Sequence, residues 1–188
     1  STNHIKEEKC YWWDIHFMKS MEKGISQSKI SIEFVELYKQ NWKEVEDSIK
    51  LKYGETVFQS KNDLMRPMNS KELKEFANHD EVSLANHTNN HQNLENYSIQ
   101  DLESFILEGH DYLKNELDIE SKSLAYPYGF YNKNTILATK KLNYKLGYTI
   151  NEGKNYLYNY NPFEIKRFSL NGYEYMPDIC HRALISNS

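Results

Sequence analysis

The 188-residue sequence predicts an α/β fold built on a parallel sheet. Strand-like and helix-like segments alternate between residues 81 and 150 in the order strand–helix–strand–helix–strand, with short connections. Such alternation is typical of parallel sheets covered by helices. The two most unusual motifs, at residues 87–91 and 126–129, each directly follow a predicted strand. Because the carboxyl ends of parallel strands meet at one edge of a sheet, we expect the two motifs to form one site.

The first part of the chain predicts helices and an aromatic anchor. Residues 10–18 form a dense aromatic patch, which we interpret as a small hydrophobic anchor. Between residues 31 and 51 apolar residues recur at helical spacing, and Gly54 then ends the run. Because this region is highly charged, we interpret residues 20–66 as a helical insert. The insert would lie within a single domain that spans residues 1–188.

The second half supplies the expected sheet and its covering helices. Ser98 is a good helix N-cap, and Asp101 lies in the first turn, where negative charge is favoured. The apolar residues that follow keep the 3.6-residue period as far as Leu117. The other expected elements are a helix that Ser70 can cap, a helix at 132–142, and strands at 81–86, 123–126, 147–150 and 164–170.

The composition excludes several classes of protein. The net charge is −4 and no stripe of Lys and Arg is dense, so we do not expect nucleic-acid binding. No apolar run reaches the roughly 18 residues that a transmembrane helix needs. Cys10 and Cys180 are too few for a disulfide scaffold, and the sequence leaves open whether they pair. The 15 Tyr fit either a sugar-binding surface or the composition of an AT-rich genome.

The segment from Asn86 to Leu94 is the most informative part of the chain. His87 and His91 stand four residues apart at the end of a predicted strand, with Thr88 between them. This spacing predicts that both imidazoles lie on one face of a single turn and reach one ion. A divalent metal held in this way can polarise a carbonyl group and activate water. We expect structural roles for the other five histidines, which form no comparable group: His4, His16, His79, His110 and His181.

A second motif, Ala125-Tyr126-Pro127-Tyr128-Gly129, follows the histidines by one helix and one strand. With it the chain resembles the polysaccharide deacetylases of the NodB-homology type, carbohydrate esterase family 4. The family's His-[Ser/Thr]-x-x-His motif is matched by residues 87–91, and its Arg-x-Pro-[Tyr/Phe]-Gly motif is matched except at Ala125. The Trp12-Trp13-Asp14 segment is similar to one branch of this family, in which that Arg is often Ala.

The resemblance implies a distorted (β/α) barrel and metal-dependent removal of an N- or O-acetyl group from a sugar. His87 and His91 would be two of the ligands to a divalent metal, which we expect to be zinc. The backbone N–H of Tyr128 would stabilise the oxyanion. Substrate-binding positions in the same motif would be Tyr126, Pro127 and Gly129.

Three departures from the family pattern limit this expectation. The opening Thr-Phe-Asp-Asp motif, which supplies the general base and the third metal ligand, is absent. Ala125 cannot orient a carboxylate as Arg would, and Arg167 is our candidate replacement. The closing Leu-x-x-His motif is not recognisable. We therefore expect the first barrel strands to lie upstream of Ser1 and the chain to have weak activity or none by itself.

Two alternatives to a hydrolase remain open. The chain could be a non-catalytic carbohydrate-binding domain that keeps the aromatic faces of Tyr126, Tyr128, Trp12 and Trp13 but not the chemistry. It could instead be a piece of a larger assembly that associates through unpaired sheet edges. In each case the expected partner is an acetylated oligosaccharide or polysaccharide, at the bacterial cell envelope or in cytoplasmic glycan assembly. The sequence does not fix the compartment.

Overall fold

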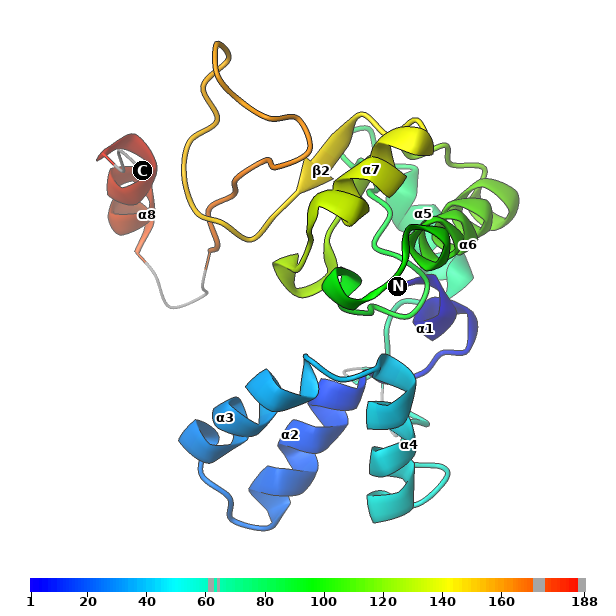
Figure 1. Ribbon diagram of the computed structural model, residues 1–188. Helices are drawn as coiled ribbons and strands as arrows, with labels where there is room; N and C mark the ends of the chain where they lie inside the picture. The colour runs from blue at the N-terminus through cyan, green and yellow to red at the C-terminus, as the bar shows by residue number, and fades with distance from the viewer. Residues whose placement is uncertain (61–62, 64, 171–174, 186–188) are drawn as a thin grey trace.

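A computed structural model describes residues 1–60, 63, 65–170 and 175–185 (Figure 1). The described chain is α/β, with helices and a small parallel sheet. Its helices are α1 (Thr2–Lys6), α2 (Trp12–Glu22), α3 (Gln27–Leu37), α4 (Trp42–Tyr53), α5 (Ser70–Ala77), α6 (Ile99–Leu117), α7 (Lys133–Lys141) and α8 (Met176–Ile185). Two short 3₁₀ helices, η1 (Leu94–Asn96) and η2 (Pro127–Gly129), and two strands, β1 (Ser123–Ala125) and β2 (Leu146–Tyr148), complete the set.

The sheet is parallel, as predicted, but smaller than expected. β1 pairs with β2, and single parallel bridges extend the pairing from Leu124 to Asn86 and from Tyr148 to Ile165. The strands predicted at 81–86 and 164–170 are therefore reduced to these bridges. The described residues form no closed sheet, so a barrel is not present in this part of the chain.

One hydrophobic core lies around the sheet and the helices α6 and α7, which pack against each other (Figure 1). Leu102 and Ile106 of α6 are fully buried there with Leu124 of β1. Ser98 caps α6 by accepting a hydrogen bond from the Asp101 N–H at 3.2 Å, as the sequence predicted. The long 3.6-residue apolar period thus identified this helix correctly.

A second core lies in a separate cluster of helices, where α2 packs against both α3 and α4 (Figure 1). Trp12, Val45 and Ile49 are buried in it. The single helical run predicted from residue 31 to 51 is in fact two helices. Asn41 breaks the run because its side chain accepts a hydrogen bond from the Lys43 N–H at 2.9 Å and caps α4.

Other helix ends differ slightly from their predictions. Asn69, rather than Ser70, caps α5 through a capping box with Glu72, and the Ser70 hydroxyl bonds to the Tyr112 hydroxyl at 2.6 Å instead. Gly54 ends α4 as predicted. The insert predicted over residues 20–66 contains α3 and α4, and its residues 61, 62 and 64 lie outside the described part. The extent of the insert stays a prediction.

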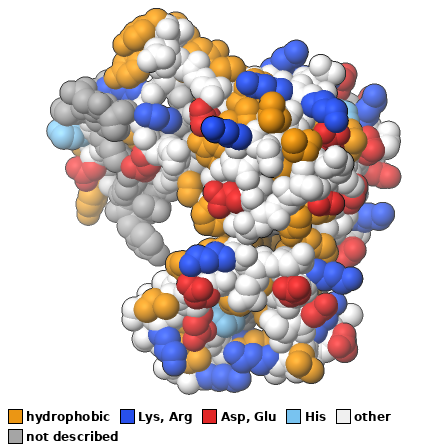
Figure 2. Space-filling view, viewed as in Figure 1, with side chains coloured by type: hydrophobic (Ala, Val, Ile, Leu, Met, Phe, Trp, Pro, Cys, Tyr) orange, Lys and Arg blue, Asp and Glu red, His pale blue; other side chains and the backbone are white. Residues whose placement is uncertain are grey.

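The surface carries both signs of charge. Figure 2 shows Lys and Arg side chains interspersed with Asp and Glu over the visible face. Within the described ranges, no helix is both long enough and apolar enough to cross a bilayer. Both cysteines are free thiols, with Cys10 buried and Cys180 exposed.

Candidate functional site

The two predicted histidines lie side by side. Their ring centroids are 4.5 Å apart, and the ring planes meet at 82°. The segment that carries them is an irregular loop rather than the expected regular turn, because Thr88 and His91 adopt left-handed backbone angles with φ of 59° and 56°. Non-glycine residues rarely take this conformation, so the surrounding structure must hold the loop in it.

A buried polar network holds this loop. The Asn86 Oδ1 accepts a hydrogen bond from the Thr88 N–H at 2.9 Å, and the Thr88 hydroxyl donates to the Gln92 Oε1 at 2.8 Å. The Gln92 amide in turn donates to the Asn89 Oδ1 at 2.9 Å. All four side chains are at most 2% exposed. Since each buried polar group finds a partner, the network fixes the backbone between the histidines.

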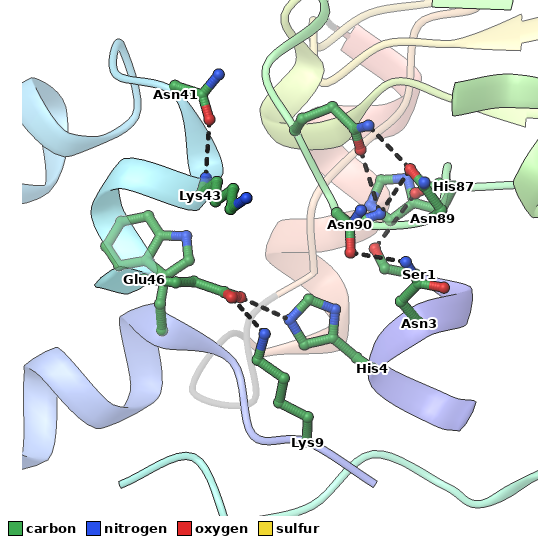
Figure 3. Close-up of polar contacts among 12 residues, drawn as sticks. Ser1, Asn3, His4, Lys9, Asn41, Lys43, Glu46, His87, Asn89 and Asn90 are labelled. Carbon is green, nitrogen blue, oxygen red and sulfur yellow. Dashed lines mark hydrogen bonds and ion pairs between the residues drawn. The ribbon is translucent and has the colours of Figure 1, made fainter. Parts of the chain in front are cut away.

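The helix α1 covers the outer side of the same loop (Figure 3). The backbone N–H groups of Thr2 and Asn3 donate to the carbonyl oxygens of Thr88 and Asn89, at 3.2 and 3.0 Å. The Asn3 side chain also donates to the Asn90 Oδ1 at 2.9 Å. These contacts provide acceptors for backbone N–H groups in the first turn of α1, which have no partner within the helix.

The ring of His87 is oriented by a backbone carbonyl of the second motif, residues 125–129. Its Nδ1 lies 2.7 Å from the carbonyl oxygen of Ala125, which can only accept a hydrogen bond. The proton of the neutral ring is therefore on Nδ1, and Nε2 keeps its lone pair. Burial lowers the pKa of His87 to about 4, so the ring is neutral at pH 7. A neutral imidazole with one nitrogen fixed by a carbonyl is the form in which His binds metals.

His91 lies in an aromatic surround. Its ring centroid is 4.3 Å from that of Tyr128, 4.7 Å from that of Trp13 and 6.2 Å from that of Tyr11. Burial, and then the neighbouring His87, lower the pKa of His91 well below its usual value. The His91 Nδ1 is buried and has no hydrogen-bond partner among the described residues. A buried ring nitrogen without a partner is uncommon, and it leaves this nitrogen able to bind a group from outside the chain.

The Pro127-Tyr128-Gly129 bend stands directly against the histidines. Tyr128 has a left-handed φ of 55°, and the bend is closed by hydrogen bonds from the N–H groups of Gly129 and Phe130 to the carbonyls of Tyr126 and Pro127. A Cβ at Gly129, where φ is +75°, would overlap the side chain of Ile150. The sequence prediction that the two motifs meet is therefore confirmed by the distance between Tyr128 and His91.

The other predicted site residues are placed less favourably. Tyr126 is 1% exposed in the core, and its hydroxyl donates to the Phe163 carbonyl at 2.8 Å. This position does not support the predicted substrate contact, because the buried ring stacks on Tyr131 instead. Arg167 is exposed and donates from Nε to the Thr149 carbonyl at 2.7 Å. Its charge makes a small contribution to lowering the pKa of His87.

His87 and His91 provide part of the ligand set that a metal ion needs. Two neutral imidazoles lie in contact, one with a free Nε2 and the other with an unpartnered Nδ1. Throughout the described ranges, no group of three or more His, Cys, Asp or Glu side chains is arranged to hold a metal ion. His87 and His91 can therefore supply two ligands of the usual four of a zinc site.

Sequence reasoning missed one buried cluster next to this site. His4 is 1% exposed, and its Nε2 lies 3.7 Å from the Oε1 of Glu46, which is 3% exposed and also pairs with Lys9 (Figure 3). Glu46 belongs to α4, far along the chain from His4, so no local pattern could reveal the contact. The nearest signal was a single Glu on the apolar side of a helix, between Val45 and Ile49.

Comparison with known proteins gives one family. The family described as "Polysaccharide deacetylase" matches residues 25–147. The Bacillus subtilis (strain 168) protein YxkH, whose name assigns it to the polysaccharide deacetylases, is 26% identical over 140 residues, which are 72% of this chain and 50% of YxkH. The Streptococcus pyogenes deacetylase PplD, solved in complex with acetate, is 30% identical with a TM-score of 0.51, over 66% of this chain and 57% of PplD. The chain thus spans about half the length of these relatives.

Proposed function

The chain belongs to the polysaccharide deacetylase family, and from this premise we propose that it is a metal-dependent hydrolase that removes acetyl groups from a carbohydrate. One observation carries the proposal: the rings of His87 and His91 lie in contact, with the Tyr128 ring 4.3 Å from that of His91. The two motifs, which lie on either side of α6 in the sequence, thus come into contact. The acetate bound to the Streptococcus deacetylase supports an acetyl group as the substrate.

His87 and His91 would hold the metal, which we propose to be zinc. When bound, such an ion polarises the acetyl carbonyl group and lowers the pKa of water. The protein's own contribution is orientation. The Ala125 carbonyl fixes the His87 ring through Nδ1, and the buried amides of Asn86 and Gln92 hold the loop between the two rings.

The bend would stabilise the negative charge that develops on the acetyl oxygen. We assign this role to the backbone N–H of Tyr128, because the closing hydrogen bonds of the bend come from Gly129 and Phe130. A rigid donor that is aimed before reaction costs no reorganisation when the charge appears. Pro127 and Gly129 fix the backbone of the bend, and we retain them as substrate-side positions. Arg167 is proposed to add positive charge near His87.

The number of ligands favours an alternative proposal. The described residues bring two side chains together but no third His, Cys, Asp or Glu, so zinc held by these alone would bind weakly. We therefore expect the isolated chain to have low activity. A non-catalytic carbohydrate-binding domain derived from the same fold is the second candidate function, and this incomplete ligand set is the observation that favours it.

We also propose that the parallel segments belong to a distorted (β/α) barrel. They follow one another in chain order from Asn86 through β1 and β2 to Ile165, which is how consecutive strands are added in such a barrel. An open sheet of this kind leaves backbone donors and acceptors at its edges. Further strands, from the same protein or another, would pair there.

The decisive assay is release of acetate. The 188-residue chain and a longer protein that contains it would be incubated with an acetylated oligosaccharide, with and without added zinc. We expect release by the longer protein to require zinc and His87, so that His87→Ala abolishes it. The matched control is His79→Ala, because His79 is exposed at the end of α5 and away from the site.

Three outcomes separate the candidates. Zinc-dependent release that is lost in His87→Ala and kept in His79→Ala supports the hydrolase. Binding of the oligosaccharide without release, by both proteins and with every divalent metal added, supports the carbohydrate-binding domain. Release that persists in His87→Ala contradicts the assigned site.

A further inference from the structure

A cleft, which we call the amide cleft, separates the turn between α3 and α4 from the segment around η1. Its volume is about 110 Å³. Figure 2 shows the surface hollowed between the helical cluster and the part of the chain above it, where the α3–α4 turn faces η1 in Figure 1. Amides predominate among the side chains that line the cleft, which are Lys39, Gln40, Asn41, Asn93, Asn96 and Tyr97.

The amide cleft adjoins the candidate site. Gln40 and Asn93 also line a narrower gap of about 10 Å³, and His91 and Tyr128 line the same gap. A gap of this size has room for about one water molecule. A sugar ring therefore stays in the amide cleft, and only a substituent as small as a methyl group extends from it toward His91.

Hydrogen bonds across the amide cleft hold its two sides together. The Asn93 side-chain amide donates to the Tyr38 carbonyl at 3.1 Å, and the Asn96 side-chain amide donates to the Lys39 carbonyl at 3.4 Å. Both bonds join the segment around η1 to the turn that follows α3. Because the two sides are fixed before a ligand arrives, little conformational entropy is lost when one binds.

Some polar groups of the amide cleft are not needed by the fold. The Asn41 Oδ1 caps α4 by accepting a hydrogen bond from the Lys43 N–H (Figure 3). Within the described ranges, the Asn41 Nδ2, the Asn96 Oδ1 and the exposed amide of Gln40 have no hydrogen-bond partner. An amide side chain both donates and accepts hydrogen bonds, as a sugar hydroxyl does. The free groups therefore match the polar groups of a sugar.

The charges around the amide cleft favour an uncharged ligand. Among the lining residues Lys39 carries a charge, and it pairs with Glu36 at 2.9 Å. Burial, and then the carboxylates of Asp101 and Glu44, raise the pKa of Tyr97. The same two carboxylates would repel an acidic sugar. Hydroxyl and acetamido groups, in contrast, bind to amides without carrying a charge.

We propose that the amide cleft binds the uncharged sugar unit that carries the acetyl group, and that Gln40 and Asn41 select this unit. The inference rests on the proposed function, since it takes the acetylated carbohydrate of that reaction as the ligand. Hydroxyl or acetamido groups of the sugar bond to the free amides, and Tyr97 flanks the ring. The α3–α4 turn thus chooses the sugar, and the histidine pair acts on its acetyl group.

The side-chain amide signals in heteronuclear NMR spectra report such contacts without depending on catalysis. The 188-residue chain, kept free of metal, would be titrated with three probes. Two are uncharged, the β-1,4-linked tetramer of N-acetylglucosamine and O-acetylated xylotetraose, and the third is the acidic O-acetylated tetramer of galacturonic acid.

Two variants and one control assign the binding to the amide cleft. Gln40→Ala removes a free amide, and Asn41→Asp keeps the oxygen that caps α4 but loses the Nδ2 donor. The matched control is Gln27→Ala, because Gln27 is an exposed glutamine of α3 that does not line the cleft. Thermal unfolding would check that each variant is folded.

We expect at least one uncharged tetramer to shift the side-chain amide signals of Gln40 and Asn41 until they saturate. Gln40→Ala and Asn41→Asp should each weaken the binding about fivefold, since each removes hydrogen bonds to the sugar. Gln27→Ala should bind as the unaltered chain does, and the acidic tetramer should bind more weakly. Should Asn41→Asp not fold, Gln40→Ala carries the test by itself.

Four results would overturn the amide cleft as the sugar site. They are the absence of binding by both uncharged tetramers, an unchanged affinity in folded Gln40→Ala, an equal loss of affinity in Gln27→Ala, and tighter binding of the acidic tetramer.

The result is separable from that of the hydrolase proposal. Binding that depends on Gln40, without release of acetate by any form of the protein, supports the amide cleft and contradicts the hydrolase. Release of acetate with a KM that is the same in Gln40→Ala supports the hydrolase and overturns the amide cleft.

Discussion

The indole Nε1 of Trp12 donates a hydrogen bond to the hydroxyl of Tyr128 at 3.2 Å. The two residues are 116 positions apart, and the bond joins the start of α2 to the bend beside the histidines. It is a polar contact between the buried helical core and a residue of the candidate site. Tyr128 is also packed against that core, so the geometry of the bend depends on the helical cluster.

Loss of this bond should destabilise the protein and loosen the bend. We expect Trp12→Phe and Tyr128→Phe each to lower the free energy of unfolding. Each substitution removes the same hydrogen bond, which contributes about 1 kcal/mol to stability. The double variant should cost less than the sum of the two single variants, because the same bond is removed only once. Urea unfolding of all four proteins measures the coupling. Strictly additive losses would show that the contact contributes nothing to stability.

Gly109 in α6 faces the side chain of Asn86. A Cβ at this position would overlap the Asn86 Oδ1, which holds the Thr88 N–H in the histidine loop. In an open helix, Ala in place of Gly stabilises by about 1 kcal/mol. Here we expect Gly109→Ala to destabilise by about 1–3 kcal/mol, because the core must shift to accept the methyl group.

The control for this prediction is Gly109→Ala in a protein that already carries Asn86→Ala. Asn86→Ala removes the atom that Gly109→Ala would overlap, at the expense of the bonds from Asn86 Nδ2 to the Ile106 carbonyl and the Tyr144 hydroxyl. In that background Gly109→Ala should become neutral or stabilising. If chemical denaturation shows the same effect of Gly109→Ala in both backgrounds, the close approach of Gly109 to Asn86 is not its cause.

The buried His4 should make stability depend on pH. Burial lowers the pKa of His4 below 6.5; Glu46 opposes this shift and Lys9 adds to it. The folded protein therefore holds fewer protons on His4 than the unfolded protein does, so stability is complete above about pH 6.5 and falls as the pH decreases toward the folded-state pKa. The measurement is the free energy of unfolding between about pH 5 and pH 7.

Two variants assign that dependence to His4. His4→Leu removes one of three buried histidines with a lowered pKa and should reduce the slope of the curve in this pH range, while His87 and His91 keep the remainder. Glu46→Gln removes the carboxylate that raises the pKa of His4, so it should make the curve steeper. A curve that keeps its slope in His4→Leu would mean that other groups produce it.

Local chemistry made several helices predictable. Ser98 with Asp101, and the long apolar period after them, identified α6 because capping and burial act within a few residues. The same logic failed between residues 31 and 51, where the apolar period runs on although the chain breaks. The signal for the break is Asn41, whose side chain caps α4.

The strands were harder to predict, since their lengths depend on their neighbours. The segment 81–86 alternates like a strand, but only Asn86 pairs with β1. The alternation of apolar and polar residues predicts which face of a sheet a side chain lies on. It does not predict how many residues pair with a neighbouring strand. The closed barrel is not a local property either, and the described residues do not contain it.

The residues of the candidate site that belong to short sequence motifs were predictable. His87, His91 and Tyr128 come together because their motifs follow neighbouring parallel strands. Tyr126 could not be separated from Tyr128 by sequence, since both are tyrosines of one motif and only the fold buries one of them. The pair of His4 and Glu46 was missed because its contact joins distant segments.

The central claim is that His87 and His91 bind one metal ion together, and zinc affinity tests it most directly. Competition with a chromophoric chelator would compare the unaltered chain with His87→Ala, His91→Ala and the control His79→Ala. The account predicts one zinc per chain, an affinity at least about tenfold lower in each of the first two variants, and no change in His79→Ala. Zinc affinity that is the same in all four proteins would contradict it.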